Sequence, residues 1–393
     1  KENTVTPSLT FTSILGNHTL LGGVQGYFTR LRETGLYVIS AEDEKTSPYY
    51  GVPYTSIGKK HANEVGFFVQ DEWNVTPKLT VVPGIRVDSH SSGEEYATSV
   101  KVSDSAFPTT KFSKTTVNPR IAIKYELTPS LVLRANVGTG FRAPYGFSED
   151  LHLCSGSPRV WKSSNLKGER AISYNLSADY YAKKYQFSIN IFRTNLKDKI
   201  QFSPADDEVK KFGYSYQWEN VDDAYVQGIE LGAKANLFRN FNAGINWTFN
   251  QGKFKHERAD WSDPNDETVK EFPQRLQYAK DSRNISRFPA MTGDIDLDYT
   301  PGTWTFSLTS SLQGRMFIDY NSEDDGATSK IKKTNTFMIF NCRAAKRFGT
   351  CTVYAGAKNI FSYIQDEKHT DDAAFMYAPV YGATWYVGLS VKL

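Results

Sequence analysis

Aromatic side chains that can stack on a planar ligand recur in the segments between the predicted strands and at the strand ends beside them. They include Trp161, Tyr216, Trp218, Trp261, Tyr320 and Tyr377. Aromatic rings offer broad apolar faces to flat ligands. Rings close to a strand end also occur where a protein meets lipid headgroups. For Tyr216 and Trp218, both ligand contact and an interfacial role stay open.

A second candidate position is the segment Phe141–Pro144, with Tyr145 directly after it. One interpretation gives Arg142 and Tyr145 a role in ligand contact, with the fixed φ of Pro144 setting the angle at which the chain leaves the strand. The alternative is an ordinary strand end with a structural role only. The residue types alone do not separate the two interpretations.

Catalytic motifs do not occur in this sequence. It has no nucleophile elbow, no phosphate-binding glycine loop and no Cys/His metal cluster. Asp88, His90 and Ser91 are close together, but a Ser-Ser-Gly run after a strand is ordinary loop sequence. A net charge of +3 over 393 residues does not indicate nucleic acid binding. We expect neither an enzyme nor a cofactor.

Alternating apolar and polar residues predict the elements that carry these side chains. Leu131, Leu133, Ala135 and Val137 alternate with polar neighbours, and Ile172, Tyr174, Leu176 and Ala178 do the same. Because successive side chains of a strand point to opposite faces, each run has one apolar and one polar face. The sequence contains no run of eighteen apolar residues, so a membrane-spanning helix is excluded. A soluble β-sandwich gives the same alternation, and so does a membrane barrel whose polar face meets water and whose apolar face meets lipid.

The pattern predicts fifteen strands, separated alternately by short turns and long loops. They fall near 6–14, 18–32, 62–75, 79–91, 113–127, 131–142, 169–181, 185–203, 214–236, 240–254, 287–299, 303–318, 333–347, 351–361 and 380–393. Seven short and seven long connections interleave, which is typical of an outer-membrane β-barrel. Such barrels close, and bacterial single-chain ones have an even number of strands. Either the count is wrong or strands that precede this sequence are absent.

The chain resembles TonB-dependent outer-membrane receptors, in particular those of Bacteroidetes-like bacteria. The resemblance is carried by the segments Val65–Trp73, Gly84–Asp88, Asn118–Arg120, Gly138–Pro144 and Asn165–Leu176. The resemblance implies an all-β, antiparallel transmembrane barrel with short periplasmic turns and long extracellular loops. It also implies that residues 1–393 hold about fifteen of an expected twenty-two strands, and that the N-terminal plug domain, its TonB-contacting segment and the first strands are absent.

The same resemblance draws attention to His152, because haem receptors of this family place an iron-ligating histidine in that interval. An ordinary loop histidine is the alternative. Basic residues of the predicted loops, such as Arg142, Arg159 and Lys162, can attract an anionic iron chelate, pair with lipopolysaccharide phosphates or stay solvated. Acidic tips at Asp206–Glu208, Glu323–Asp325 and Asp371–Asp372 supply oxygen ligands for Ca²⁺ but lack an EF-hand spacing.

The resemblance implies a bacterial outer-membrane receptor for active uptake of a scarce, bulky nutrient: a ferric siderophore, a cobalamin-like corrinoid or haem. Its partners would be TonB, reached through the missing plug, the ligand, outer-membrane lipid and lipopolysaccharide. The alternative is a plug-free porin or adhesin barrel. A soluble lectin-like β protein is a more distant one. The sequence does not identify the ligand.

Overall fold

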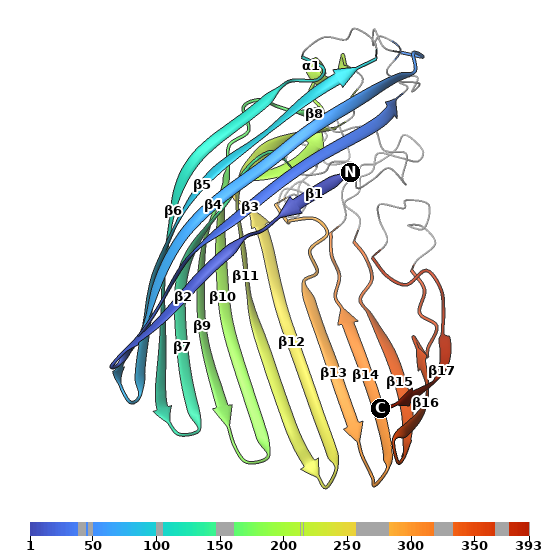
Figure 1. The fold of residues 1–393 in the computed structure, drawn as a ribbon. Coiled ribbons are helices and arrows are strands. Elements are labelled where there is room, and N and C mark those ends of the chain that lie inside the picture. Colours follow the sequence, from blue (N-terminus) through green and yellow to red (C-terminus); the bar gives the residue numbers. More distant parts are fainter. Residues whose placement is uncertain are drawn as a thin grey trace, which may run out of the picture. The chain divides into compact units, whose positions relative to one another are not determined.

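The computed structural model describes residues 1–37, 45, 50–99, 105–146, 161–212, 214, 216–256, 283–317, 333–365 and 377–392. Within these residues the chain forms seventeen strands of one sheet and one short helix (Figure 1). Every strand pair whose register is known is antiparallel except β8 with β11. Within the described residues, no helix is long and apolar enough to cross a membrane.

The first ten strands are β1 (Glu2–Val5), β2 (Ser8–Leu15), β3 (His18–Tyr37), β4 (Tyr54–Thr76), β5 (Leu79–Thr98), β6 (Thr110–Thr128), β7 (Leu131–Arg142), β8 (Trp161–Lys162), β9 (Glu169–Tyr181) and β10 (Tyr185–Pro204). Helix α1 (Asp207–Lys210) follows them. The remaining strands are β11 (Tyr216–Phe238), β12 (Phe241–Phe254), β13 (Met291–Tyr299), β14 (Trp304–Gln313), β15 (Phe337–Phe348), β16 (Cys351–Lys358) and β17 (Thr384–Val391).

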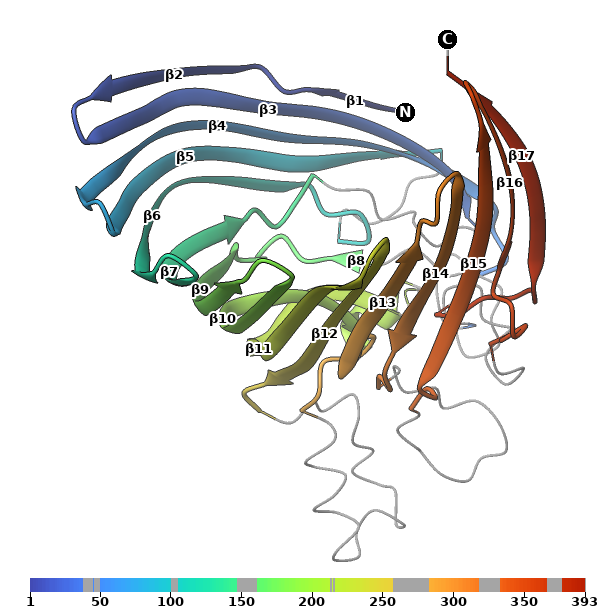
Figure 2. The same cartoon turned by 90° about the horizontal axis from the view of Figure 1, so that it is seen from below.

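The fifteen strands predicted from the alternation correspond to fifteen long passages of the described chain. Strands β1 and β2 both pair with β3, one after the other, and Figure 2 shows them as one line beside it. Strand β8 is a two-residue segment that pairs with β11. Joining β1 to β2 and setting β8 aside leaves the predicted passages.

Several strands are longer at their loop-bearing ends than the sequence predicts. Strand β3 runs to Tyr37 instead of residue 32, β4 begins at Tyr54 instead of 62, and β5 ends at Thr98 instead of 91. In these extensions apolar residues such as Leu36, Tyr54 and Ile57 are isolated among charged and hydroxyl side chains, so the alternation of apolar and polar residues stops although the hydrogen-bonded ladder continues. The predicted loops 33–61 and 92–112 are correspondingly too long.

The chain divides into two compact units. Unit 1 consists of residues 1–124, 136–174 and 194–224, and unit 2 consists of residues 125–135, 175–193 and 225–393. Strands β1–β5 and β8 belong to unit 1, and strands β12–β17 belong to unit 2. Strands β6, β7, β9, β10 and β11 contribute residues to both.

Unit 1 has one apolar and one polar sheet face. On β4 and β5, Phe67 pairs with Val87 and Val69 pairs with Ile85, and all four side chains are exposed on the apolar face. Their neighbours in sequence point the other way, so Gly66 pairs with Asp88 on the polar face. Exposed apolar rows of this kind fit a lipid-facing surface.

Unit 2 has the same division between its faces. Ile245 pairs with Ile295 and is 39% exposed on the apolar face. Asn246 pairs with Asp294, and Asn242 pairs with Asp298, on the polar face. This is the division into one apolar and one polar face that alternating residues predict, and the aspartates lie away from the apolar rows.

Short turns close the hairpins opposite the loops. Gly16, Gly302 and Gly349 adopt φ values of +62°, +62° and +61° in three of them, and Asn240 adopts +66° in a fourth. These left-handed conformations suit Gly and Asn, which explains the residue types at the turns. Cys342 and Cys351 are free thiols and not a disulfide.

Candidate functional site

A row of buried charges lies on the polar face of unit 1, at the loop-bearing ends of its strands. The Lys60 ammonium of β4 lies 2.5 Å from a Glu33 carboxylate oxygen of β3. The Lys162 ammonium of β8 lies 2.6 Å from Glu94 Oε1 of β5. Because Lys60 also pairs with Glu94 in the β4–β5 register, the two ion pairs are neighbours. Ions this deep in a protein need partners, and here acids and bases alternate.

Glu94 is the centre of this row. It is 1% exposed, and Gly146 N–H and Tyr96 Oη donate hydrogen bonds to its carboxylate at 3.0 and 2.7 Å. Burial alone would raise the pKa of Glu94, but the nearby Lys162 and Lys60 ammonium groups outweigh it and the pKa is lowered. Glu94 is therefore ionised at neutral pH.

Glu94 connects the two described ends of the chain on either side of residues 147–160. Gly146 is the last described residue before that segment, and the strand that contains Lys162 begins directly after it. Gly146 has φ +89°, and a Cβ there would overlap the backbone of His61 and the side chain of Ala62. A glycine is thus required where the chain lies against β4. One carboxylate therefore anchors both roots of the segment that carries His152.

Tyr145 is 3% exposed beside this anchor. Its hydroxyl donates to the Ser163 carbonyl at 2.7 Å and accepts from Leu166 N–H at 3.0 Å. Burial raises the pKa of Tyr145 to about 12, so the phenol keeps its proton. In this arrangement Tyr145 fastens the chain after residue 160. Its predicted ligand contact stays a prediction.

Arg142 is the most accessible member of this group. Its side chain is about half exposed, with Nη1 3.7 Å from a Glu169 carboxylate oxygen. The preceding Phe141 packs inward, with its ring centroid 4.8 Å from that of His90 and 6.0 Å from that of Phe112. Among the described candidates, Arg142 has the geometry best suited to an anionic ligand.

In the parallel pairing of β8 with β11, Trp161 pairs with Gln217 and Trp218 pairs with Lys162, so the two indoles point to opposite faces of the sheet. Trp161 Nε1 donates to the Ser105 carbonyl at 2.9 Å, and its ring packs on a small apolar cluster of Ala205, Val209 and Tyr214. Both tryptophans thus lie in unit 1 with Glu94. Tyr216 begins β11, but its side chain is outside the described part of the structure.

Tyr377 belongs to unit 2. Its ring is 6.3 Å from that of Phe337, which stacks on Tyr363 at 4.7 Å. Its N–H donates to Oε1 of the buried Gln365. His152, Trp261 and Tyr320 lie outside the described residues. The candidates therefore do not form one site in the described structure: one group gathers around Glu94, and Tyr377 belongs to a separate aromatic cluster.

The predicted cation-binding tips gain no support in the described residues. Asp206 caps helix α1, and its Oδ1 accepts from the N–H groups of Glu208 and Val209. The tips at 323–325 and 371–372 fall outside the described ranges. Where the structure describes the chain, no group of three or more His, Cys, Asp or Glu side chains could hold a metal ion.

A second polar network joins two of the motifs that carry the resemblance, those at residues 84–88 and 118–120. Arg86 Nε donates to Asp88 Oδ1 at 2.6 Å, and Asn118 Nδ2 donates to Asp88 Oδ2 at 3.1 Å. Arg120 donates to Gln70 on the same face. The motifs at 84–88 and 118–120 thus connect β4, β5 and β6. These residues carry part of the family resemblance, and their contacts depend on the register of the three strands.

Ser91, Asp88 and His90 do not form a catalytic set. All three lie within the predicted strand 79–91, and the Ser-Ser-Gly run that was predicted as loop also belongs to this strand, because β5 runs to Thr98. Asp88 and His90 share the polar face, whereas Ser91 points to the opposite face with Asn63 as its cross-strand partner. His90 instead contacts Thr116 Oγ1 at 3.1 Å and Glu64 Oε2 at 3.3 Å.

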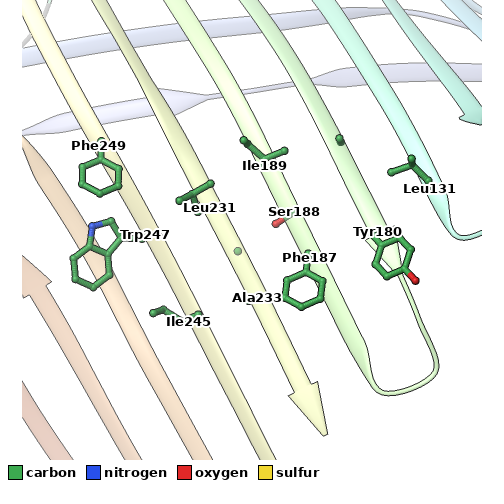
Figure 3. A pocket seen from close by; sticks show the side chains of 12 residues that line it. Leu131, Tyr180, Phe187, Ser188, Ile189, Leu231, Ala233, Ile245, Trp247 and Phe249 are labelled. Carbon is green, nitrogen blue, oxygen red and sulfur yellow. The ribbon is translucent and has the colours of Figure 1, made fainter. Parts of the chain in front are cut away.

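A hollow on the apolar face of unit 2 is shown in Figure 3. It has a volume of about 590 Å³, and Phe187, Leu231, Ile245 and Trp247 line it together with other apolar side chains. Large rings surround the small residue Ala233 in the figure. Such a surface suits hydrocarbon and not a charged nutrient. The candidate uptake residues are therefore those of the polar face and its loop-bearing ends.

Comparison with known proteins agrees with this architecture. The family model "TonB dependent receptor-like, beta-barrel" matches residues 2–360. The chain is 27% identical over 266 residues to the vitamin B12 transporter BtuB of Photobacterium profundum, covering 66% of this chain and 36% of that protein. It is 21% identical over 357 residues to the ferric enterobactin receptor PirA of Pseudomonas aeruginosa, covering 85% and 42%.

Among solved structures, the copper transporter OprC superposes with a TM-score of 0.69 at 18% identity, covering 99% of this chain and 56% of that one. The chain thus spans between about a third and a little over half of the length of these proteins. The fold, the alternating faces and the family match over most of the sequence lead to one conclusion: this chain belongs to the TonB-dependent receptor β-barrel family of the bacterial outer membrane.

Proposed function

We propose that this chain is the barrel portion of a receptor that takes up a scarce, bulky nutrient by energy-dependent transport. The observation that carries the proposal is the family match over residues 2–360, together with relatives whose names include a vitamin B12 transporter and a ferric enterobactin receptor. The ligand class is a ferric siderophore, a cobalamin-like corrinoid or haem. TonB would act through a plug domain encoded with the barrel in the full-length protein.

The anchored loop roots support capture at the loop-bearing ends. Glu94 holds Gly146 and Lys162 in place, and Arg142, at the end of β7, keeps its side chain about half exposed. An exposed cation at this end of the strands is suited to an anionic chelate. This group is the proposed barrel contribution to ligand capture. Catalysis has no part in the proposal.

The test uses the full-length protein in a strain whose own gene is deleted. Growth is measured with ferric catecholate, cyanocobalamin or haem as the single source of iron or corrinoid. Restoration by the wild-type gene on one source, and its loss when the proton gradient is collapsed, would support the proposal. Growth on all sources that continues without the gradient would contradict it.

The alternative is a plug-free porin or adhesin barrel. Reading the coding sequence upstream of residue 1 separates the two, because a mixed α/β segment of about 120 residues after a signal peptide belongs to the receptor. Single-channel conductance gives the functional counterpart. A steady open pore of the purified full-length protein would favour the porin, and a closed barrel would favour the receptor.

A further inference from the structure

The polar face of β15 carries an aromatic side chain at its loop-bearing end. Phe337, the first residue of β15, pairs with Gln313 of β14, and its side chain is 7% exposed. Gln313 lies six residues after Ser307 on β14, and Ser307 donates to Asp298 on the polar face. Because an even spacing keeps the side chains of a strand on one face, Phe337 also belongs to the polar face. It therefore lies on the face of the aspartates and not on the lipid-facing one.

Two tyrosines from either side of residues 366–376 meet at Phe337. The Tyr363 ring stacks on it at a centroid distance of 4.7 Å, with 9° between the ring planes. The Tyr377 ring lies 6.3 Å from it, and Gln313 Nε2 donates to the Tyr377 carbonyl at 3.4 Å. Both tyrosines are half-buried. The arrangement of these rings therefore depends on what holds the two segments of backbone that carry them.

Gln365 holds the segment that carries Tyr377. It is 1% exposed, and its Oε1 accepts from the N–H groups of Tyr377 and Ala378 at 2.9 and 3.1 Å. Its own N–H donates to the Pro379 carbonyl at 2.8 Å. Two donors use both lone pairs of an amide oxygen. One buried side chain thus fixes the backbone on which the Tyr377 ring stands.

Asn359 holds the segment that carries Tyr363. It is 6% exposed and follows β16 directly, with φ +52°, a conformation that asparagine tolerates. Its Nδ2 donates to the Tyr363 and Tyr381 carbonyls at 2.7 and 3.3 Å, and its Oδ1 accepts from Tyr363 N–H at 2.9 Å. Asn359 N–H donates to Asn341 Oδ1 of β15 at 3.0 Å. Amide side chains therefore connect the sheet to both tyrosines.

The partners that the structure describes for these amides are neutral, whereas the Glu94 anchor of unit 1 depends on ions. Buried polar groups remain in a protein at little cost when hydrogen bonds satisfy them, and their bonds fix the backbone in one arrangement. A ligand binds more tightly to side chains that are already held in place, because less conformational entropy is lost on binding. Support of the strand ends alone is the alternative role.

We propose that Gln365 and Asn359 are positioning residues for nutrient capture, which act by holding Tyr363 and Tyr377 in one arrangement against Phe337. This inference rests on the proposed uptake function and adds to it an uncharged capture element on unit 2. Aromatic rings on the polar face suit the planar part of a nutrient, such as a catecholate ring, a corrin or a porphyrin. The two amides would act on affinity through the tyrosines and not by touching the nutrient.

The test uses the full-length protein and the variants Gln365→Ala, Gln365→Glu and Asn359→Asp. Gln251→Ala is the matched control in unit 2, because Gln251 Oε1 accepts from another side chain and not from the backbone. Hydrogen exchange of the Tyr377 and Ala378 amides reports how firmly the backbone is held, and thermal unfolding reports global stability. Titration with ferric enterobactin, cyanocobalamin and haemin reports capture.

Gln365→Ala should accelerate exchange of both amides by about tenfold or more, because two N–H groups lose their acceptor. It should weaken binding of the probe that the wild type retains by about tenfold, while the unfolding midpoint stays near that of the control. Gln365→Glu keeps an acceptor for both N–H groups and should behave as the wild type at pH 7. Asn359→Asp loses both donated bonds and should behave as Gln365→Ala does.

Unchanged exchange in Gln365→Ala, or an equal loss of affinity in the Gln251→Ala control, would overturn the proposal. Faster exchange with unchanged affinity would leave Gln365 a purely structural role and overturn it as well. Equal behaviour of Gln365→Glu and Gln365→Ala would do the same, because the hydrogen-bond acceptor would then not matter. A wild type that binds none of the three probes would contradict the proposed uptake function instead, and the exchange contrast between the variants would persist.

Discussion

The polar faces of the two units stabilise their carboxylates in different ways. In unit 1, acids and bases alternate and are paired, as in Glu33 with Lys60 and Glu94 with Lys162. In unit 2, Asp294, Asp296 and Asp298 follow one another on β13, and their close partners are neutral groups such as Asn246 Nδ2 at 2.8 Å and Ser307 Oγ at 2.5 Å. Within the described residues none of these three aspartates makes an ion pair within 4.0 Å, although Arg134 and Asp179 form one elsewhere in unit 2.

The presence or absence of paired charges determines which environment each polar face can tolerate. A self-neutralised face can be buried and can hold its own loops, because each charge has its counter-charge at hand. A row of like charges stays favourable only where water or an external cationic partner surrounds it. Unit 1 is therefore suited to fix the loop roots, and the polar face of unit 2 is suited to remain hydrated. Four measurements test this contrast.

The largest effect is expected at Glu94. Glu94→Ala leaves the Lys162 ammonium buried without the carboxylate that lies 2.6 Å away, and breaking a buried pair in this way costs about 3–5 kcal/mol. Thermal unfolding and hydrogen exchange at the Gly146 amide measure the loss. The double variant Glu94→Gln/Lys162→Met should recover most of it. Wild-type protection of Gly146 in the single variant would refute the anchoring role.

The same anchor should fail in acid and not at neutral pH. The pKa of Glu94 is lowered from 4.5 because Lys162 and Lys60 outweigh the effect of burial. A lowered native pKa gives stability that is complete above about pH 4.5 and disappears as the pH falls through the native value. Exchange of the Gly146 amide, corrected for its intrinsic pH dependence, should stay constant from pH 7 to 5 and accelerate below that. Acceleration already between pH 7 and 5 would contradict the assignment.

Tyr145→Phe should have an intermediate effect. The substitution removes the donor to Ser163 and the acceptor for Leu166 N–H while keeping the ring, so two buried backbone groups lose their partner. Unsatisfied buried groups cost about 1–3 kcal/mol. The unfolding midpoint measures the cost, and nutrient affinity of the full-length protein tests the separate idea of direct ligand contact. Tenfold weaker binding with unchanged stability would place the hydroxyl on the ligand and not on the chain.

The smallest effect is expected at Asp296 of unit 2. Asp296→Asn removes one of three like charges that alternate along one strand face, and like-charge neighbours destabilise by less than about 1 kcal/mol. Stability should stay equal or rise slightly, and Asp296→Glu should match the wild type. A loss as large as that of Glu94→Ala would show that unit 2 also relies on buried, paired charges.

Much of the fold could be predicted because its main signal is local. Alternation along β12, for example, places Ile245 and Asn246 on opposite faces without any knowledge of neighbouring strands. The signal ends where apolar residues become sparse and no longer alternate, so Tyr54–His61 of β4 was predicted as loop. Backbone hydrogen bonds continue there, and the residue types no longer report them.

The site was harder to predict because its contacts are far apart in sequence. Arg142, Tyr145 and Trp161 were singled out by type and place, and the structure positions them in unit 1. Glu94, Lys60 and Lys162 were not recognised as a group. Their association depends on the register of β4 with β5 and on a two-residue strand after residue 160. The signal that could have found Glu94 is a lone acid on the polar face of a strand whose partner strand carries a lysine there.

The residues on either side of residues 147–160 are both bound to one carboxylate, that of Glu94. Residues 147–160 can change in length and composition while Gly146 and Lys162 keep their places on Glu94. Evolution can therefore exchange what such a segment recognises without disturbing the strands that stand in the membrane. Receptors with new ligand preferences would arise by substitutions within residues 147–160, while Gly146, Lys162 and Glu94 stay unchanged.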